Sequence, residues 1–115
     1  MKKRTIEDKG LAFGIRISNM VDYLRSKKVG VNLDQILRSG TSIGANVCEG
    51  TYAQSTADYI TKHTIALKEA NETRFWIEIN YGKGYLTERE YVSIHNDVIE
   101  IIKILTAIIK KSKGI

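Results

Sequence analysis

The sequence is short of residues that break helices or crosslink chains. It has no proline and one cysteine, Cys48, in 115 residues. The lack of proline removes the strongest helix breaker, and a single cysteine excludes a disulfide within the chain and suits a reducing compartment. Aromatic residues make up only 8% of the chain, but 43% of the residues are hydrophobic, which indicates a globular protein. The length fits a single domain covering residues 1–115.

The chain also lacks a long apolar run. Its most apolar stretch, Val98 to Ile109, is interrupted by Glu100 and Lys103 and is too short to span a bilayer. The basic residues at the start of the chain are followed by further charged residues instead of the apolar centre of a signal peptide. We therefore expect a cytoplasmic protein that has no membrane contact.

Apolar residues recur at intervals of three and four, which predicts four amphipathic helices. The expected bounds are about Ile6 to Lys28, Leu33 to Glu49, Thr56 to Tyr81 and Glu88 to Lys111. Connections this short make consecutive helices antiparallel neighbours. The predicted fold class is therefore all-α, an antiparallel up-down-up-down four-helix bundle.

Polar residues mark the expected helix starts, and glycines mark three of the ends. Each cap position is followed three residues later by an acidic residue or glutamine, the spacing of a capping box or of a favourable charge in the first turn. The cap positions are Thr5, Asn32, Ser55 and Thr87. Gly30 and Gly50 are expected to end the first and second helices, and Gly82 and Gly84 to end the third.

One segment in the second helix is unusually rich in small residues. Residues 38–46 read Arg-Ser-Gly-Thr-Ser-Ile-Gly-Ala-Asn. Gly40 and Gly44 each cost a helix about 1 kcal/mol relative to alanine, so we expect a neighbouring backbone to approach closely there. The neighbour is either another helix of the bundle or a second subunit. We favour self-association, because the second helix has few large apolar side chains.

Motifs for metal, nucleotide or thiol chemistry are incomplete. Neither His63 nor His95 has an acidic residue three positions before it, as a carboxylate-bridged metal site in a bundle requires. The segment Gly40 to Gly44 lacks the Lys-Ser/Thr pair of a phosphate loop. Cys48 is expected to be a small packed thiol. We expect no catalytic residues, no metal and no cofactor.

Paired carboxylates on the third helix leave two interpretations open. Glu69 and Glu72 lie one helical turn apart, and paired carboxylates can perform acid–base catalysis. We favour a structural role in which they pair with a basic residue such as Arg38 on a neighbouring helix or subunit. The alternative is an enzyme that uses Glu69, Glu72 and His63.

The net charge of +5 is concentrated near the chain ends. A four-helix bundle brings both ends of the chain together, and the predicted nucleic-acid-binding residues are Lys2, Lys3, Arg4, Lys110, Lys111 and Lys113. The alternative is that these side chains are solvated and complement a helix C-terminus. No aromatic residue lies among them, so no base-stacking platform is expected there.

Four short motifs of the chain are shared with a known family. They are Leu37 to Asn46, Glu49-Gly50, Ala66 to Glu72, and Trp76. Together they resemble the bacterial four helix bundle protein family, also called ribosomal-RNA intervening-sequence proteins, and the resemblance extends from Phe13 to about Leu105. It implies a four-helix bundle that assembles into a ring-like homopentamer and has no established enzymatic activity. The chain is also similar to accessory proteins of diversity-generating retroelements, which bind a reverse transcriptase and nucleic acid through a basic surface.

The resemblance carries over to individual residues as signature positions. These are Arg38, Ser39, Ser42, Asn46, Glu49, Lys68, Glu69, Glu72 and Trp76; with Gly40 and Gly44 they form the predicted oligomer interface or family signature. The predicted function is a non-catalytic oligomeric bundle that binds RNA or other nucleic acid. The alternative is a protein-interaction scaffold, or an accessory subunit of a nucleic-acid enzyme, with Tyr52, Phe75 and Trp76 as aromatic anchors.

Overall fold

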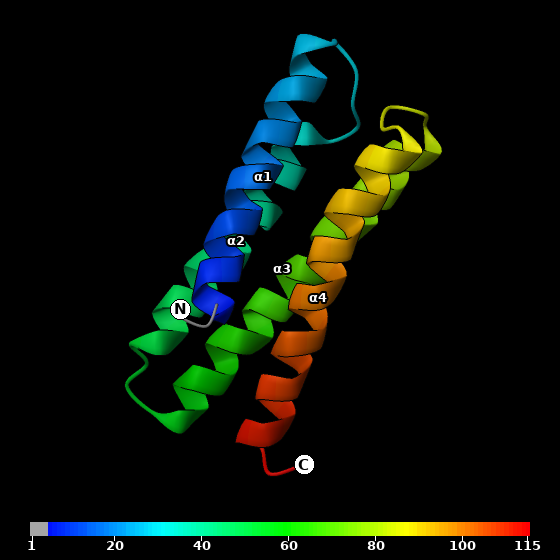
Figure 1. Cartoon of the computed structure of the whole chain (residues 1–115). Helices are drawn as coiled ribbons and strands as arrows, with labels where there is room; N and C mark the ends of the chain where they lie inside the picture. The colour runs from blue at the N-terminus through cyan, green and yellow to red at the C-terminus, as the bar shows by residue number, and fades with distance from the viewer. Residues whose placement is uncertain (1–4) are drawn as a thin grey trace, which may run out of the picture.

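The computed structural model of the chain describes residues 5–115. Its helices are α1 (Ile6–Ser26), α2 (Leu33–Thr51), α3 (Thr56–Gly82) and α4 (Glu88–Ser112). Consecutive helices pack against each other and α1 packs against α4, whereas the diagonal pairs do not approach within residues 5–115. The predicted antiparallel four-helix bundle is therefore confirmed (Figure 1).

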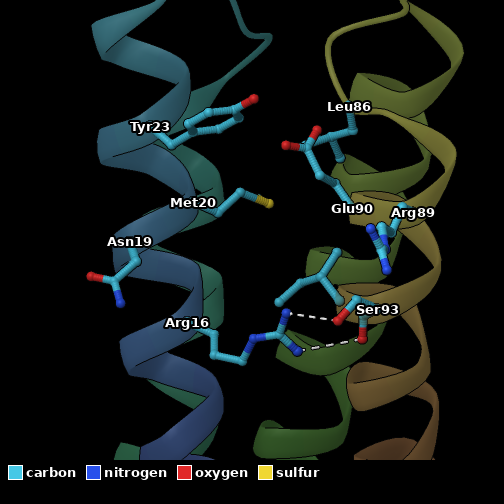
Figure 2. A pocket seen from close by; sticks show the side chains of 9 residues that line it. Arg16, Asn19, Met20, Tyr23, Leu86, Arg89, Glu90 and Ser93 are labelled. Atoms are coloured by element: carbon cyan, nitrogen blue, oxygen red, sulfur yellow. Dashed lines mark hydrogen bonds between the residues drawn. The ribbon is translucent and has the colours of Figure 1, made fainter.

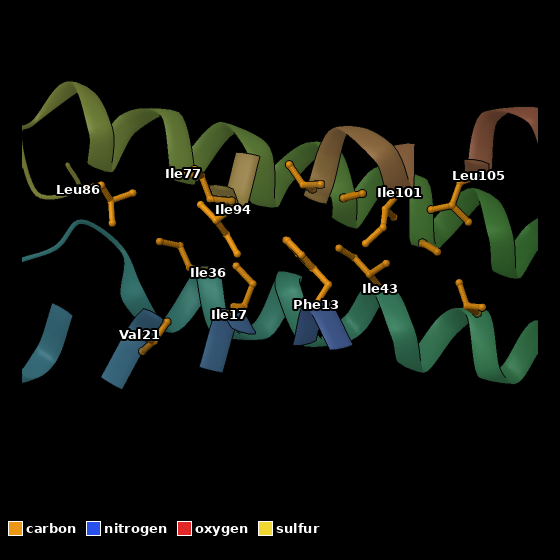
Figure 3. Packing of buried hydrophobic residues seen from close by; sticks show 14 of the residues in the cluster. Phe13, Ile17, Val21, Ile36, Ile43, Ile77, Leu86, Ile94, Ile101 and Leu105 are labelled. Carbon is orange, nitrogen blue, oxygen red and sulfur yellow. The ribbon is translucent and has the colours of Figure 1, made fainter. Parts of the chain in front are cut away.

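Each helix buries one stripe of side chains in a single core. The largest fully buried side chains include Phe13 and Ile17 of α1, Ile36 and Ile43 of α2, Ile77 of α3, and Ile101 and Leu105 of α4. Figure 3 shows these residues meeting between the α1/α2 pair and the α3/α4 pair. Burying an apolar side chain of this size stabilises the fold by about 1.5–3 kcal/mol, so this core is the main source of stability.

Three of the predicted caps are confirmed. Thr5 accepts a hydrogen bond from the Asp8 backbone at 3.3 Å, and the Asp8 carboxylate accepts from the Thr5 backbone at 3.4 Å. Thr87 and Glu90 form the same reciprocal pair at 3.1 and 2.8 Å. Ser55 accepts from the backbone N–H of the third residue of α3 at 3.1 Å. These bonds satisfy amides that have no partner inside their own helix.

The predictions at Asn32 and Gly50 are wrong. Asn32 adopts a left-handed backbone with φ 52° and its side chain makes no capping bond. Gly50 lies inside α2, which continues to Thr51. A Cβ at Gly50 would lie 2.6 Å from Cε1 of His63, so this glycine makes room for the imidazole and does not end the helix.

The first helix ends at Ser26, two residues before the predicted end. Lys28 takes a left-handed backbone with φ 58°, and the backbone N–H groups of Lys28 and Val29 donate to carbonyls of the last turn at 3.0 and 3.1 Å. This is a Schellman arrangement, in which glycine is the usual left-handed residue. Lys28 therefore ends the helix in place of Gly30, while Gly84 (φ 81°) fills the corresponding position after α3.

Gly40 and Gly44 of α2 face α1. A Cβ at Gly40 would lie 2.6 Å from Cγ2 of Ile17, and one at Gly44 would lie 3.0 Å from the carbonyl carbon of Gly10. The expected close approach is therefore confirmed, and the neighbour is a helix of the same chain. Contact of this segment with a second copy stays a prediction. Separately, no helix within residues 5–115 is long and apolar enough to cross a membrane.

Candidate functional site

The signature residues of α2 and α3 form an ion-pair network across the α2/α3 seam. The guanidinium of Arg38 donates to Glu69 at 3.0 Å and to both oxygens of Glu72 at 2.8 and 2.7 Å. The indole N–H of Trp76 also donates to Glu72, at 3.2 Å. The hydrogen bond to Glu72, followed by the charge of Glu69, raises the pKa of Arg38 above its ordinary value. The predicted pairing of these carboxylates with Arg38 is confirmed.

Other signature residues bind within the chain as well. The hydroxyls of Ser39 and Thr73 lie 2.8 Å apart inside the α2/α3 seam, where both residues are buried. Ser42 donates to the carbonyl of Arg38 at 2.6 Å, and Asn46 donates to the carbonyl of Ser42 at 2.9 Å. Much of the signature therefore fixes α2 and its contact with α3.

Two further signature positions lie on the surface. Glu49 forms an ion pair with Lys62 of α3 at 3.3 Å. Lys68 is exposed and has no partner among residues 5–115. None of these contacts tests the predicted oligomer interface.

The residues of the enzyme hypothesis do not converge in a cleft. Arg38 occupies the carboxylates of Glu69 and Glu72. His63 is buried beside Gly50, and its Nδ1 lies 2.8 Å from the carbonyl oxygen of Tyr59. This arrangement contradicts the hypothesis of an active site formed by Glu69, Glu72 and His63.

The expectation for Cys48 is wrong, because the thiol is exposed and does not pack in the core. Sequence periodicity places it on the side of α2 away from the core, but the thiol's small size suggested burial. His95 lies in the α3/α4 seam, with Nε2 2.9 Å from the Glu78 carboxylate. In the described part of the chain, no three histidine, cysteine, aspartate or glutamate residues come together as metal ligands.

The predicted terminal cluster is only partly within the described residues. Lys2, Lys3 and Arg4 lie outside them, whereas Lys110, Lys111 and Lys113 are exposed and unpaired among residues 5–115. The start of α1 and the end of α4 lie toward the same end of the bundle (Figure 1). That end also holds the end of α2 and the start of α3, which bring Glu7, Glu49 and Asp58 to the same region. Carboxylates therefore offset part of the predicted basic end.

A groove of about 620 Å³ follows the outer side of the α1/α2 seam. Its apolar wall includes Leu11, Ile15 and Tyr52, which are 66%, 55% and 81% exposed. Small residues, including Gly14 and Ala45, form its floor. Among residues 5–115, the charged side chains that line it are Glu7 and Asp8, which repel a phosphate backbone.

A second hollow of about 490 Å³ lies in the α1/α4 seam (Figure 2). Met20, Leu86 and Ile94 supply apolar surface, with Tyr23 at one side. The remaining lining residues are Arg16, Asn19, Arg89, Glu90 and Ser93. Its lining in the described structure includes no histidine or cysteine.

Polar groups around this hollow already have partners. Arg16 donates to the Ser93 hydroxyl at 3.0 Å and pairs with Asp97. The backbone N–H of Thr87, followed by the hydroxyl of Tyr23, donates to Glu90 and lowers the pKa of that carboxyl. The hollow could not be predicted from the sequence, because its size depends on the distance between α1 and α4.

The comparisons with known proteins place the chain in one family. No curated protein matches it. A solved structure, described as a protein of unknown function from the S23 ribosomal protein family of Bacteroides thetaiotaomicron VPI-5482, is 51% identical with a TM-score of 0.89. The match covers 92% of this chain and 99% of the other. The family model for the 23S rRNA-intervening sequence protein matches residues 2–107, so the chain belongs to that family.

Proposed function

We propose that this chain is a non-catalytic subunit of a homo-oligomer, a pentamer, that binds RNA or other nucleic acid in the bacterial cytoplasm. The supporting observation is a surplus of unpaired positive charge on the surface. The exposed basic residues without a partner among residues 5–115 are Lys28, Lys68, Lys83, Arg89, Lys103, Lys110, Lys111 and Lys113. The exposed acidic residues without a partner among residues 5–115 are fewer: Glu7, Asp22 and Glu88.

Assembly would strengthen a weak basic surface. Each lysine or arginine near a phosphate releases counterions and contributes to affinity without reading the sequence. Five copies that contact one strand bind it with avidity, because the second and later contacts are intramolecular. The apolar groove between α1 and α2 provides the surface for that assembly, since no element of residues 5–115 covers its exposed Leu11, Ile15 and Tyr52.

The test is RNA binding by the intact oligomer over a range of salt concentrations. We expect a gel-mobility shift at low salt whose apparent affinity falls steeply as salt rises. Light scattering on the same sample should confirm the assembly. An absent shift at low salt, with the oligomer intact, overturns the proposal.

A second candidate is a scaffold or accessory subunit for a protein such as a nucleic-acid enzyme. It is favoured by the exposure of the aromatic rings of Tyr52 and Phe75, at 81% and 52%, because aromatic residues often anchor protein interfaces. Crosslinking in the native cells, followed by identification of bound protein and RNA, separates the two. Saturable RNA binding with no protein partner counts against the scaffold.

A further inference from the structure

Helix α4 carries a line of polar residues along its exposed side. Arg89, Asn96, Lys103 and Lys110 recur every seven residues, and all are exposed. Seven residues complete nearly two turns of an α-helix, so these positions fall close to one line. The line faces away from the core residues of the same helix and extends for about 31 Å at 1.5 Å per residue. We call these four residues the α4 stripe.

The positive charge of the α4 stripe is not compensated. Arg89, Lys103 and Lys110 have no ion-pair or hydrogen-bond partner within residues 5–115. The nearby Glu100 is paired with Lys9 of α1 at 2.6 Å. The stripe therefore differs from the α1/α2 groove, which no lysine or arginine of residues 5–115 lines.

Helix α3 carries an exposed aromatic ring at a level near the middle of the α4 stripe. The rings of Tyr81 and Tyr91 stack at 4.0 Å, and Glu78 binds His95 at 2.9 Å, which fixes the register of α3 against α4. In that register Phe75 lies at the level between Asn96 and Lys103. Phe75 is 52% exposed and stands one helical turn from Glu78. Lys68, seven residues before Phe75, adds a further exposed cation on the same side of α3.

We propose that single-stranded RNA runs along the α4 stripe, with phosphates at Arg89, Lys103 and Lys110 and a base against the ring of Phe75. This inference rests on the proposed function and names the surface and the form of the nucleic acid. A guanidinium donates two parallel bonds to a phosphate, and a lysine acts as a point charge. An exposed ring favours an unpaired strand, because its bases are free to stack on aromatic side chains.

The test compares two triple variants with the same charge change. The first is Arg89→Glu with Lys103→Glu and Lys110→Glu. The matched control is Lys27→Glu with Lys28→Glu and Lys83→Glu, which replaces three exposed lysines that lie outside both the α4 stripe and the predicted terminal cluster. Fluorescence anisotropy with a labelled oligouridine RNA of about 20 nucleotides, long enough to cover the whole stripe at about 3.4 Å per nucleotide, measures affinity and its salt dependence.

We expect the stripe variant to lose at least about tenfold in affinity at 50 mM salt. The slope of log affinity against log salt concentration should become shallower by about 2, because each lost phosphate contact reduces it by about 0.7 for a single strand. The control should lose less than about threefold. Equal losses of affinity in both variants overturn the assignment of RNA binding to the α4 stripe but leave the proposed function intact. If the parent oligomer does not bind this RNA at all, the proposed function fails first. Circular dichroism melts confirm that each variant is folded, and the corresponding glutamine variants replace any that is not.

The aromatic contact has its own variant. Phe75→Leu keeps an apolar side chain but removes the ring, and should weaken binding of the single strand by about five- to tenfold. Duplex RNA of the same length should compete less well than the single strand. Equal competition by duplex, together with unchanged binding by Phe75→Leu, overturns the assignment to a single strand.

Discussion

At the scale of single residues, glycine sets the distance between α1 and α2. Gly10 of α1 and Gly44 of α2 meet so closely that a Cβ at Gly10 would lie 2.9 Å from the Cα of Gly44. Because that neighbour is backbone, it cannot rotate away as a side chain can. Four residues later, a Cβ at Gly14 would have its nearest neighbour, the Cα of Thr41, at an ordinary 3.8 Å. The same helix therefore contains one glycine that the packing requires and one that it does not.

This difference predicts opposite effects for the same substitution. Gly10→Ala should lower the free energy of unfolding by about 1–2 kcal/mol, because overpacking outweighs the better helix propensity of alanine. Gly14→Ala should raise it by up to about 1 kcal/mol, because propensity acts alone. Urea denaturation followed by circular dichroism measures both. Equal changes in the two variants would show that the contact with Gly44 is not tight.

At the scale of helices, Asn80 ties the α1–α2 connection to α3. Asn80 is fully buried; its amide oxygen accepts from the Val31 backbone N–H at 2.8 Å and its amide nitrogen donates to the Val31 carbonyl at 3.1 Å. The same nitrogen lies 2.8 Å from the carbonyl of Trp76. A single side chain thus satisfies both backbone polar groups of Val31, in a connection that has no regular structure of its own.

Removing that amide should loosen the connection. Asn80→Ala leaves the N–H and C=O of Val31 without these partners and should cost about 1–3 kcal/mol. The control is Asn71→Ala on the same helix, where the exposed amide bonds only its own helix at the Leu67 carbonyl. We expect that variant to be neutral or slightly stabilised, because alanine is the better helix former. Urea melts and amide exchange at Val31 report the difference; a stable Asn80→Ala with a protected Val31 would contradict it.

The start of α4 should respond to pH. The pKa of Glu90 is lowered in the folded chain, chiefly by the hydrogen bond from the Thr87 backbone. A carboxyl with a lowered folded pKa contributes stability above its unfolded pKa, about 4.3, and loses it as the pH falls through the folded pKa. Glu90→Gln should therefore be less stable than the parent at pH 7, by about 0.5 kcal/mol, and the difference should shrink as the pH falls from 7 to 3.

A second substitution at the same cap separates charge from hydrogen bonding. The Thr87 hydroxyl accepts from the Glu90 backbone at 3.1 Å and does not titrate in this range. Thr87→Ala should cost about 1 kcal/mol at both pH values. Thermal melts at pH 7 and pH 3 measure all three proteins. A deficit in Glu90→Gln that is the same at both pH values would exclude ionisation as its cause.

The helices themselves follow from the sequence because their apolar periodicity and three of their caps are local signals. Local signals fail where a tertiary contact decides the conformation. A glycine at position 50 is typical of a helix end, but here the residue has to be small because His63 of α3 packs against it. Lys28 ends α1 with a left-handed backbone that sequence reasoning assigned to Gly30. Periodicity also indicates which side of α2 carries small residues, but it does not indicate which helix packs against that side. In the structure that helix is α1.

At the scale of the whole molecule, the four sides of the bundle differ in chemistry. The α2/α3 seam is closed by the Arg38 network, and the α1/α4 seam by ion pairs beside a hollow. The α1/α2 side is apolar and exposed, whereas the α4 stripe is basic. The paired residues of the α2/α3 seam were predictable from opposite charges at helical spacing. The division between an apolar side and a basic side was not, because it requires the register of all four helices.

This division predicts which substitutions change the size of the assembly. The parent should scatter light as a multiple of its 13.0 kDa chain mass at micromolar concentration. Leu11→Lys with Ile15→Lys places two charges in the α1/α2 groove, where burying them in an interface would be costly. That variant should shift toward the mass of a single chain while its helix content stays unchanged.

The matched control places one lysine on the other side of the bundle. Val92 of α4 is 45% exposed and lies outside the groove, so Val92→Lys should keep the parent mass. If the groove variant keeps the parent mass as well, assembly uses another side of the bundle; a parent mass of a single chain would refute assembly itself.

Because avidity depends on assembly, the groove variant should also bind RNA more weakly although its α4 stripe is intact. Wild-type affinity in a monomeric groove variant would show that one bundle is sufficient to bind RNA.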